Sequence, residues 1–546
     1  MRRFSHALPR PVAGVFALLA SALLLVPASS AAQSGSPAAE GEEAQVFVGA
    51  LDAISRMHQN AVTDSALWDA ALEGMIESLN DPYATVFTPV EAEAWEEETT
   101  GNYSGIGLQI TELNDVVTVT AVFRSTPAED VGVQVGDVIV GVNQHDALEW
   151  TTSMAADSIR GPVGSRVTVR MQRPGYEAPI SFDIRRDNVH VPAVVYGVMG
   201  GNIGYTVMDR VARDAAKEMD AALEELQNTR GLIIDLRRNP GGFLNESLML
   251  ADLFLEPGST LASTSQRVPG GGQEETESES YQDRWPTRVE DLPVVILVDR
   301  FTASGAEILA GALQDYDRAL VLGERSFGKG VVQTVMRLPH GRRLRFTTGE
   351  WQTPLGRSLH RPRDMQMRPV EEDLDTFPRV TTPDGRTLVN GGGIFPDLEV
   401  EGDTLTTVEQ ELIRSANEVE VPLGLRLAER SFEAARALEE AGEPAHLDDE
   451  ILAGFVADLM EEGLPEETVA SQEVRDYLAW RLRVGIAQRM NDIGAEANFR
   501  QERDPVLEEA VRLLGEVTTQ TELFEVAEER SIASRGEAED RSDGGI

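Results

Sequence analysis

The 546-residue chain contains no cysteine, which excludes disulfide bonds, a thiol nucleophile and a lipid-attachment cysteine. It is almost as poor in lysine, since only Lys217 and Lys329 are found among its 48 basic residues. Arginine stays protonated in proteins, whereas a buried lysine can lose its proton and act as a base. Lys217 lies in a polar stretch typical of a helix surface, whereas Lys329 lies in the loop sequence Phe327-Gly328-Lys329-Gly330. Lys329 is therefore the candidate for a chemical role.

Positive charge as a whole is scarce. The chain has 92 acidic residues and a formal net charge of −44, which argues against a nucleic-acid partner. Much of this acidity falls in the last third of the chain, where adaptation to a salty environment and an acidic binding surface both remain open. Apolar residues make up 41% of the chain, enough for globular cores, and the length predicts three or four folded units.

Long apolar runs are absent except near the amino terminus. Residues 1–32 have the features of a secretory signal, with early arginines, an apolar run over 13–26 and small residues over 28–32. The apolar run is shorter than the ~20 residues that a membrane span needs, so we expect cleavage, with an uncleaved anchor as the alternative. We expect no transmembrane span after cleavage. Export without cysteine suits the periplasm or cell-envelope surface of a bacterium.

The periodicity of apolar residues divides the rest of the chain. It is helical between Ala44 and Glu97, changes to short β-type runs from Gly101 to Arg186, and is helical again after Gly402. Between these parts, strands and helices alternate, which predicts βαβ units with parallel strand pairing. The predicted units are a signal peptide (1–32), a linker and N-terminal helical region (33–100), a mostly-β module (101–187), an α/β core (188–402), an acidic helical C-terminal extension (403–530) and a disordered tail (531–546).

Three loops of the α/β core carry the candidate chemistry, each after a predicted strand. Ser304 follows the strand Val294–Val298 and precedes a helix, whose N-terminal N–H groups and dipole favour developing negative charge. Lys329 follows the strand Ala319–Leu322, and a Pro-Gly-Gly turn follows the strand Leu232–Leu236. Parallel strands bring such loops to one edge of the sheet. Ser304 alone could be a simple helix N-cap, but the convergence favours a nucleophile.

This arrangement predicts a serine hydrolase mechanism. Neutral Lys329 would accept the hydroxyl proton of Ser304 as it attacks a peptide carbonyl, giving an acyl-enzyme that water clears. Burial among apolar neighbours must lower the pKa of lysine from its free value of about 10.4 by several units. Gln333, four residues after the lysine, can orient the amine. The oxyanion would be held by the N–H groups of Gly305 and of Gly241 or Gly242.

Histidine is the competing base, since His340 and His360 belong to the same core. His340 lies in a hairpin-turn context and His360 lies beside a polar stretch, so we expect both to be surface residues. No two histidines have the spacing of metal ligands, and we expect no metal or cofactor. Two polar stretches, 266–288 and 361–391, interrupt the core pattern, and we expect them to be surface insertions.

Several motifs in the same order resemble the carboxyl-terminal processing peptidases, tail-specific serine proteases with a Ser/Lys dyad. The matching stretches are Asp235–Gly242, Thr302–Glu307, Gly311–Asp315, Phe327–Gln333 and Gly393–Asp397. The resemblance implies Ser304 as nucleophile, Lys329 as base and Gln333 as a supporting residue. Gly305 stands where the family more often has alanine, which leaves the backbone N–H available. The two polar stretches leave the substrate contacts near the cleft open.

The mostly-β module resembles a PDZ domain, through Tyr103–Leu108 as the carboxylate-binding loop and Val135–Ile139 as a second signature. Consecutive N–H groups can hold a terminal carboxylate while the peptide adds to the sheet edge, although the loop could also be an ordinary turn. The peptide-binding residues that this implies are Gly105, Ile106, Gly107 and Leu108. The implied fold is an α/β protease core with parallel βαβ units, a mostly-β PDZ domain and helical N- and C-terminal regions.

From these features we expect an exported serine endopeptidase that recognises the apolar C-terminal tails of envelope proteins through its PDZ domain. The alternative is a catalytically inactive PDZ scaffold that binds envelope proteins. The N-terminal helices are candidates for a homodimer interface, as in relatives, and an adaptor protein is a further candidate partner.

Overall fold

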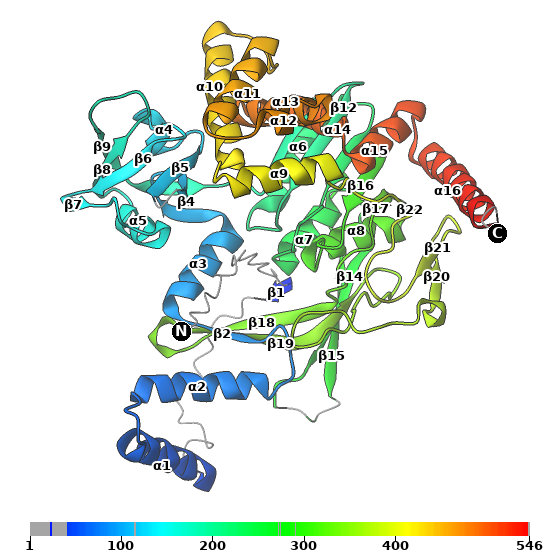
Figure 1. The fold of residues 1–546 in the computed structure, drawn as a ribbon. Helices are drawn as coiled ribbons and strands as arrows, with labels where there is room; N and C mark the ends of the chain where they lie inside the picture. Colours follow the sequence, from blue (N-terminus) through cyan, green and yellow to red (C-terminus); the bar gives the residue numbers. More distant parts are fainter. Residues whose placement is uncertain are drawn as a thin grey trace, which may run out of the picture.

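The computed structural model describes residues 22–24, 41–113, 116–270, 272, 275–289 and 291–543, with side chains from 41 to 531. The predicted signal peptide lies outside the described residues except for the backbone of 22–24. Figure 1 shows the α/β core (green) in the middle, with the N-terminal helices α1 and α2 (blue) at one end and most of the C-terminal helices (yellow to red) at the other, and the mostly-β module (cyan) to one side. No helix in these ranges is long and apolar enough to cross a membrane.

The N-terminal region begins with two helices that bury none of their residues, α1 (Glu42–Met57) and α2 (Asp64–Glu77). After α2 the chain turns into the short strand β2 (Thr85–Phe87), which pairs with β19 (Arg343–Gln352) of the core. The helix α3 (Pro89–Thr100) follows, with a capping box at Thr88 and Glu91. The helical periodicity predicted the helices, but not the strand that fastens this region to the core.

The mostly-β module is confirmed. Its sheet has the order β4-β5-β6-β8-β9, with β7 beside β6, and β4 is an edge strand that contacts the helix α5 (Thr152–Ile159). The strands are β4 (Leu108–Leu113), β5 (Val116–Val122), β6 (Val138–Val142), β7 (His145–Asp146), β8 (Arg166–Gln172) and β9 (Ile180–Arg185). A separate ladder, β3 (Asn102–Gly105) with β10 (Asp187–His190), pairs the two ends of the module. The short helix α4 (Pro127–Asp130) completes it.

The α/β core is built on a second sheet, of order β11-β12-β13-β16-β17-β22. Every pair in it is parallel except β11 with β12, so the predicted parallel pairing is confirmed. The strands are β11 (Val194–Met199), β12 (Ile203–Met208), β13 (Leu232–Asp235), β16 (Val294–Val298), β17 (Leu320–Gly323) and β22 (Leu398–Glu399).

Helices cover both faces of this sheet, which explains why its central strands are continuously apolar. Leu232 and Ile234 pack toward the helices α6 (Ala215–Leu226), α7 (Leu244–Asp252) and α8 (Gly305–Asp315). Ile233 lies between these two residues in the sequence and therefore points to the opposite face of the sheet. There it packs against the C-terminal helices α15 (Pro505–Glu516) and α16 (Gln520–Asp543). The C-terminal extension therefore completes the hydrophobic core of the α/β domain.

A third sheet has the order β1-β18-β19-β14-β15. Its strands are β1 (Ala22–Leu24), β14 (Thr260–Arg267), β15 (Thr276–Gln282), β18 (Val331–Arg337) and β19, with the 3₁₀ turn η3 (Pro339–Gly341) between β18 and β19. The first polar stretch contributes the hairpin β14–β15, whose strand β15 is exposed as expected.

The second polar stretch, expected to be a surface insertion, packs instead against the loop of Lys329. The N–H of Arg361 donates to Gly328 O (2.8 Å), and the guanidinium of Arg363 donates to Phe327 O (2.7 Å). The expectation was wrong because arginine can cover apolar surface and still satisfy buried carbonyls. Beyond these contacts the stretch forms η4 (Leu374–Thr376), β20 (Arg379–Thr381) and β21 (Thr387–Val389).

The C-terminal extension is helical as predicted, and α16 continues to Asp543, beyond the point at which the composition predicted a disordered tail. The remaining helices are α9 (Thr407–Glu418), α10 (Leu423–Ala441), α11 (Asp449–Glu461), α12 (Glu466–Val469), α13 (Gln472–Arg489) and α14 (Ile493–Gln501). The extension also reaches the mostly-β module, where Arg489 donates to Thr120 O (2.7 Å) and Glu439 pairs with Arg124 (2.7 Å).

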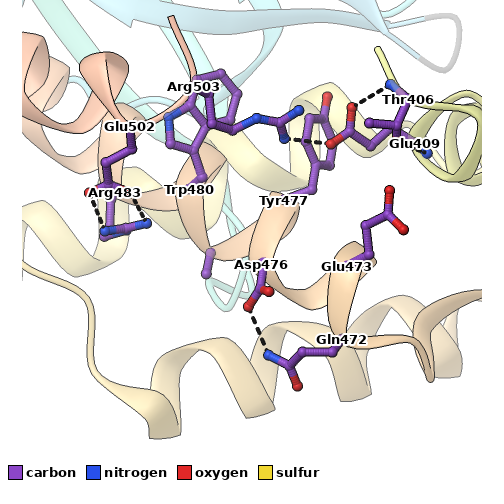
Figure 2. A pocket seen from close by; sticks show the side chains of 11 residues that line it. Thr406, Glu409, Gln472, Glu473, Asp476, Tyr477, Trp480, Arg483, Glu502 and Arg503 are labelled. Atoms are coloured by element: carbon purple, nitrogen blue, oxygen red, sulfur yellow. Dashed lines mark hydrogen bonds and ion pairs between the residues drawn. The ribbon is translucent and has the colours of Figure 1, made fainter. Parts of the chain in front are cut away.

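A hollow of about 550 Å³ lies between α9, α13 and the turn that follows α14. Figure 2 shows two ion pairs among the side chains that line it. Arg503 binds Glu409 (2.5 Å) and lies over the rings of Tyr477 and Trp480, while Arg483 binds Glu502 (2.6 Å). The hollow therefore lies where helices of the extension meet, and these ion pairs hold the helices together.

A test of the fold concerns two carboxyl groups that meet where β15 ends. The backbone N–H of Arg284 donates to Asp252 (3.0 Å) and that of Trp285 to Asp283 (3.0 Å). Burial raises the pKa of Asp283 from 3.8 to about 6, with Asp252 adding to the effect. Because the pKa is higher in the folded state, this proton stabilises the fold below about pH 4, and the contribution is lost as the pH rises through 6.

We therefore expect Asp283→Asn, which keeps a hydrogen-bond donor toward Asp252, to stabilise the protein at pH 7.5 more than at pH 4.5. Urea unfolding at the two pH values measures the difference. The exposed Glu256→Gln is the control and should shift stability equally at both. A pH-independent effect of Asp283→Asn would contradict the interpretation.

Candidate active site

Ser304 lies between β16 and α8, at the N-cap position of the helix, and is fully buried. Its backbone has φ 53° and ψ −115°, a conformation that costs energy for any residue with a side chain. Such strain persists only where the surroundings hold it, and it is common at functional sites. The sequence predicted the position of Ser304 at the end of a strand, but not this backbone conformation.

Hydrogen bonds join the three loops that the sequence placed at one sheet edge. The N–H of Ala303 donates to Asn239 O (2.9 Å), and the N–H of Phe327 donates to Thr302 O (2.9 Å). The hydroxyl of Thr302 donates in turn to Leu236 O (2.9 Å). The loop of Ser304 is therefore bonded on one side to the glycine turn and on the other to the lysine loop, which confirms the predicted convergence.

Glu307 is the residue of the site that sequence reasoning missed. Its fully buried carboxylate accepts the N–H of Ser304 (2.8 Å), of Gly328 (2.7 Å) and of Lys329 (2.8 Å), and also the hydroxyl of Ser326. Burial raises the pKa of Glu307 even though all these donors lower it. The carboxylate thus clamps the serine loop to the lysine loop. A glutamate three residues after an N-cap serine is the capping-box pattern, and this was the available signal.

Lys329 is also fully buried, and the indole N–H of Trp351 donates to the carbonyl oxygen of Lys329 (3.0 Å). Burial lowers the pKa of Lys329 well below its ordinary value of 10.5, and the nearby Arg345 lowers it further. The carboxylates of Asp81 and Glu307 act in the opposite direction. An amine in these surroundings gives up its proton more readily than an exposed lysine does, as a general base requires.

Gln333 is buried at a bulge of β18, and its side-chain amide donates to Tyr83 O (2.9 Å). Tyr83 comes from the N-terminal region, 250 residues earlier, and its ring centroid lies 4.8 Å from the Nζ of Lys329. The sequence pattern gave no indication of a role for Tyr83. The N-terminal region therefore supplies part of the site.

The two glycines of the Pro-Gly-Gly turn differ in what their N–H groups do. Gly241, at φ 91°, donates its N–H to the side chain of Asn239 (2.8 Å). A Cβ on Gly241 would lie 2.5 Å from Gly305 N, so the turn needs glycine there to approach the serine loop. A Cβ on Gly305 would lie 3.1 Å from Gly242 N, which shows that these two residues are adjacent. Gly242 is therefore the better partner for Gly305 in an oxyanion site.

The two histidines occupy different places. His340 lies in η3 at the far end of the β18–β19 hairpin and is exposed, as expected. His360, expected at the surface, is partly buried: its backbone packs against Gly330, and burial lowers its pKa. Its Nδ1 is buried without a hydrogen-bond partner in the described part of the chain. Of the two, His360 is the one that lies beside the lysine loop.

The predicted peptide-binding residues form a turn into an edge strand. Ile106 is buried, Gly107 has φ 89° and packs on Thr126, and Leu108 begins β4. The N–H of Phe123 donates to Gly107 O (3.0 Å), so the next residue, Leu108, turns its own N–H away from β5. That N–H points to the open edge of β4, where a peptide strand could be added.

Comparison with known proteins agrees with this architecture. Residues 104–184 match the model of the PDZ domain, and residues 202–373 match that of peptidase family S41. The chain is 32% identical over 318 residues to a probable CtpA-like serine protease of Staphylococcus epidermidis, covering 57% of this chain and 63% of that protein. It is 32% identical over 317 residues to the carboxy-terminal-processing protease of Bartonella bacilliformis, covering 56% and 71%.

Among solved structures, the photosystem II D1 C-terminal processing protease is 26% identical, with a TM-score of 0.34, covering 61% of this chain and 92% of that one. The fold and the matched models define a PDZ-containing peptidase of the S41 type. The chain belongs to the carboxy-terminal-processing protease family. It covers less than two thirds of the length of the staphylococcal relatives.

The clamp predicts that Glu307→Gln lowers stability and activity together. The amide would turn an N–H₂ group toward backbone donors, leaving at least one buried N–H unsatisfied at a cost of about 2–3 kcal/mol. Urea unfolding and peptide hydrolysis measure the two effects. The exposed Glu256→Gln is the matched control, with no loss expected. Full activity of Glu307→Gln would show that the clamp does not position the two loops.

Proposed function

We propose that the chain is an exported serine endopeptidase in which Ser304 is the nucleophile and Lys329 the general base. The observation that carries this proposal is a fully buried lysine with a lowered pKa, on a loop that Glu307 clamps to the loop of a strained, buried serine. The family membership supports it independently. A pseudoprotease has no need to maintain either strain or a buried amine.

The chemistry follows from these positions. Neutral Lys329 takes the hydroxyl proton of Ser304 as its Oγ attacks the peptide carbonyl. The N–H groups of Gly305 and Gly242 stabilise the oxyanion of the tetrahedral intermediate. The lysine ammonium then gives its proton to the departing amine, leaving an acyl-enzyme. A water molecule, deprotonated by the same lysine, hydrolyses this ester and restores the site. Gln333 holds the groups around Lys329 in place throughout.

A sheet edge next to the site could hold an extended substrate once β1 is removed. The outer edge of β18 pairs in parallel with the backbone of β1, opposite Val332, Gln333 and Thr334. That segment belongs to the predicted signal peptide, and its removal would free the edge. A peptide substrate could then add to β18 as a strand, with its backbone held beside the lysine loop.

The PDZ domain is proposed to select the substrate by its C-terminal tail. The loop Gly105-Ile106-Gly107-Leu108 and the open edge of β4 supply backbone groups for a terminal carboxylate and an extended tail. With the predicted signal peptide, this suggests envelope proteins as substrates in the periplasm or at the cell surface of a bacterium.

The decisive test uses the two lysines of the chain. We expect Ser304→Ala and Lys329→Arg each to lower kcat/KM on an unfolded protein substrate at least about 10³-fold, because alanine has no nucleophile and arginine cannot release its proton. Lys217→Arg, on the exposed face of α6, is the matched control and should be fully active. In the wild type, activity should rise with pH as Lys329 loses its proton.

Two outcomes would favour other readings. If His360→Ala abolishes hydrolysis while Lys329→Ala does not, histidine is the base. If the wild type hydrolyses nothing but binds peptides with free carboxyl termini, the protein is a PDZ scaffold.

We also propose a homodimer through α1 and α2. Both helices leave apolar side chains in solvent, among them Val46 (72% exposed), Met57 (76%) and Met75 (57%). Exposed apolar side chains gathered on two helices mark an interaction surface. We expect a dimer in sedimentation analysis and a monomer after Val46→Asp with Met57→Asp. If the wild-type protein is monomeric, we propose instead that an adaptor protein binds the exposed apolar side chains of α1 and α2.

A further inference from the structure

Tyr83 contacts both Lys329 and Gln333. It lies between α2 and β2, outside the ranges that match the PDZ and peptidase models. Its ring centroid is 4.8 Å from the Nζ of Lys329, and its carbonyl oxygen accepts the amide of Gln333 (2.9 Å). Only 5% of its surface is exposed, although it comes from a region with two largely exposed helices.

The segment around Tyr83 is fixed to the core by Asp81. One carboxylate oxygen of Asp81 accepts the N–H of Tyr83 (3.0 Å), and the other accepts the N–H of Thr347 in β19 (2.9 Å). A few residues later β2 pairs with β19 from Thr85 to Phe87. The ring of Tyr83 is thus held over the lysine by contacts on both sides of it.

The charges around Lys329 do not by themselves keep it neutral. Asp81 and Glu307 favour the ammonium form, Arg345 opposes it, and burial is the largest influence of all. The face of an aromatic ring also attracts an ammonium ion. That attraction is smaller than the cost of taking the ion out of water, so a ring that excludes water has the net effect of favouring the neutral amine.

The phenol group of Tyr83 itself contributes no charge. Burial raises the pKa of Tyr83 to about 12, so the side chain stays protonated. Its hydroxyl oxygen is buried and has no hydrogen-bond partner among the described residues, although the guanidinium of Arg363 is near. The ring of Tyr83 therefore affects the protonation of Lys329 more than the hydroxyl group does.

We propose that Tyr83 is a positioning residue whose ring walls Lys329 off from water and so holds it in its neutral form, while its carbonyl fixes Gln333. This inference rests on the proposed Ser/Lys mechanism. It assigns to the N-terminal region a direct part in preparing the base, and it distinguishes the ring of Tyr83 from its hydroxyl.

The scarcity of lysine allows a direct measurement. In the full chain labelled with ¹³C at the lysine Cε, only Lys217 and Lys329 give signals, and Lys217→Arg assigns them. We expect the Lys329 signal of the wild type to titrate well below pH 10.5. Tyr83→Phe should leave this titration unchanged, and Tyr83→Ala should move it up by at least about one pH unit, since water would enter. The acid limb of kcat/KM should move with it.

The outcomes separate this inference from the proposed mechanism. If Lys329 of the wild type titrates near 10.5, the neutral-base mechanism itself fails. If it titrates low in the wild type and equally low in folded Tyr83→Ala, the mechanism stands and the inference is overturned. Should the alanine variant not fold, Tyr83→Leu applies the same test with a smaller shift expected. Tyr281→Ala, at a tyrosine of the β14–β15 hairpin, is the control and should leave the titration unchanged.

Discussion

The carboxylate of Glu307 is the constraint on which the rest of the site depends. A buried charge is tolerated only when its hydrogen bonds are complete, and this one accepts donors from both the serine loop and the lysine loop. Separating the loops would leave the charge unsatisfied in the core. The distance between nucleophile loop and base loop is therefore fixed by an electrostatic requirement, and the strained backbone of Ser304 is maintained by the same bonds.

Parts of the chain that are remote in sequence are needed to exclude water from the hydrogen bonds that Glu307 makes with the two loops. Tyr83 comes from the N-terminal region, Trp351 from β19, and Arg363 from a stretch that reaches back to Phe327. The sheet that carries the site is itself closed on its second face by the C-terminal helices. The burial of Lys329 is thus a property of the whole assembly, more than of the segment that matches the peptidase model.

Much of the site could be predicted from the sequence because it follows from local pattern. Buried strands such as Val294–Val298, followed by helices, specify parallel pairing, and parallel pairing brings their loops together. The contributions of Tyr83 and Arg363 could not be predicted, since periodicity indicates which face of an element is buried but not what covers it. Glu307 lies between these cases: its capping pattern was visible, but its bonds to Gly328 and Lys329 depend on the tertiary fold.

The division of labour between arginine and lysine follows from the same physics. Around Lys329 the cations Arg345 and Arg363 are arginines, partly buried, and they keep their protons while their guanidinium groups bind carbonyls or stack on rings. Arg345 also lowers the pKa of the lysine by charge repulsion. A chain can therefore use arginine almost everywhere that a fixed charge is sufficient. Under the proposed mechanism, the position from which a proton leaves requires lysine, and burial must then keep water away from it.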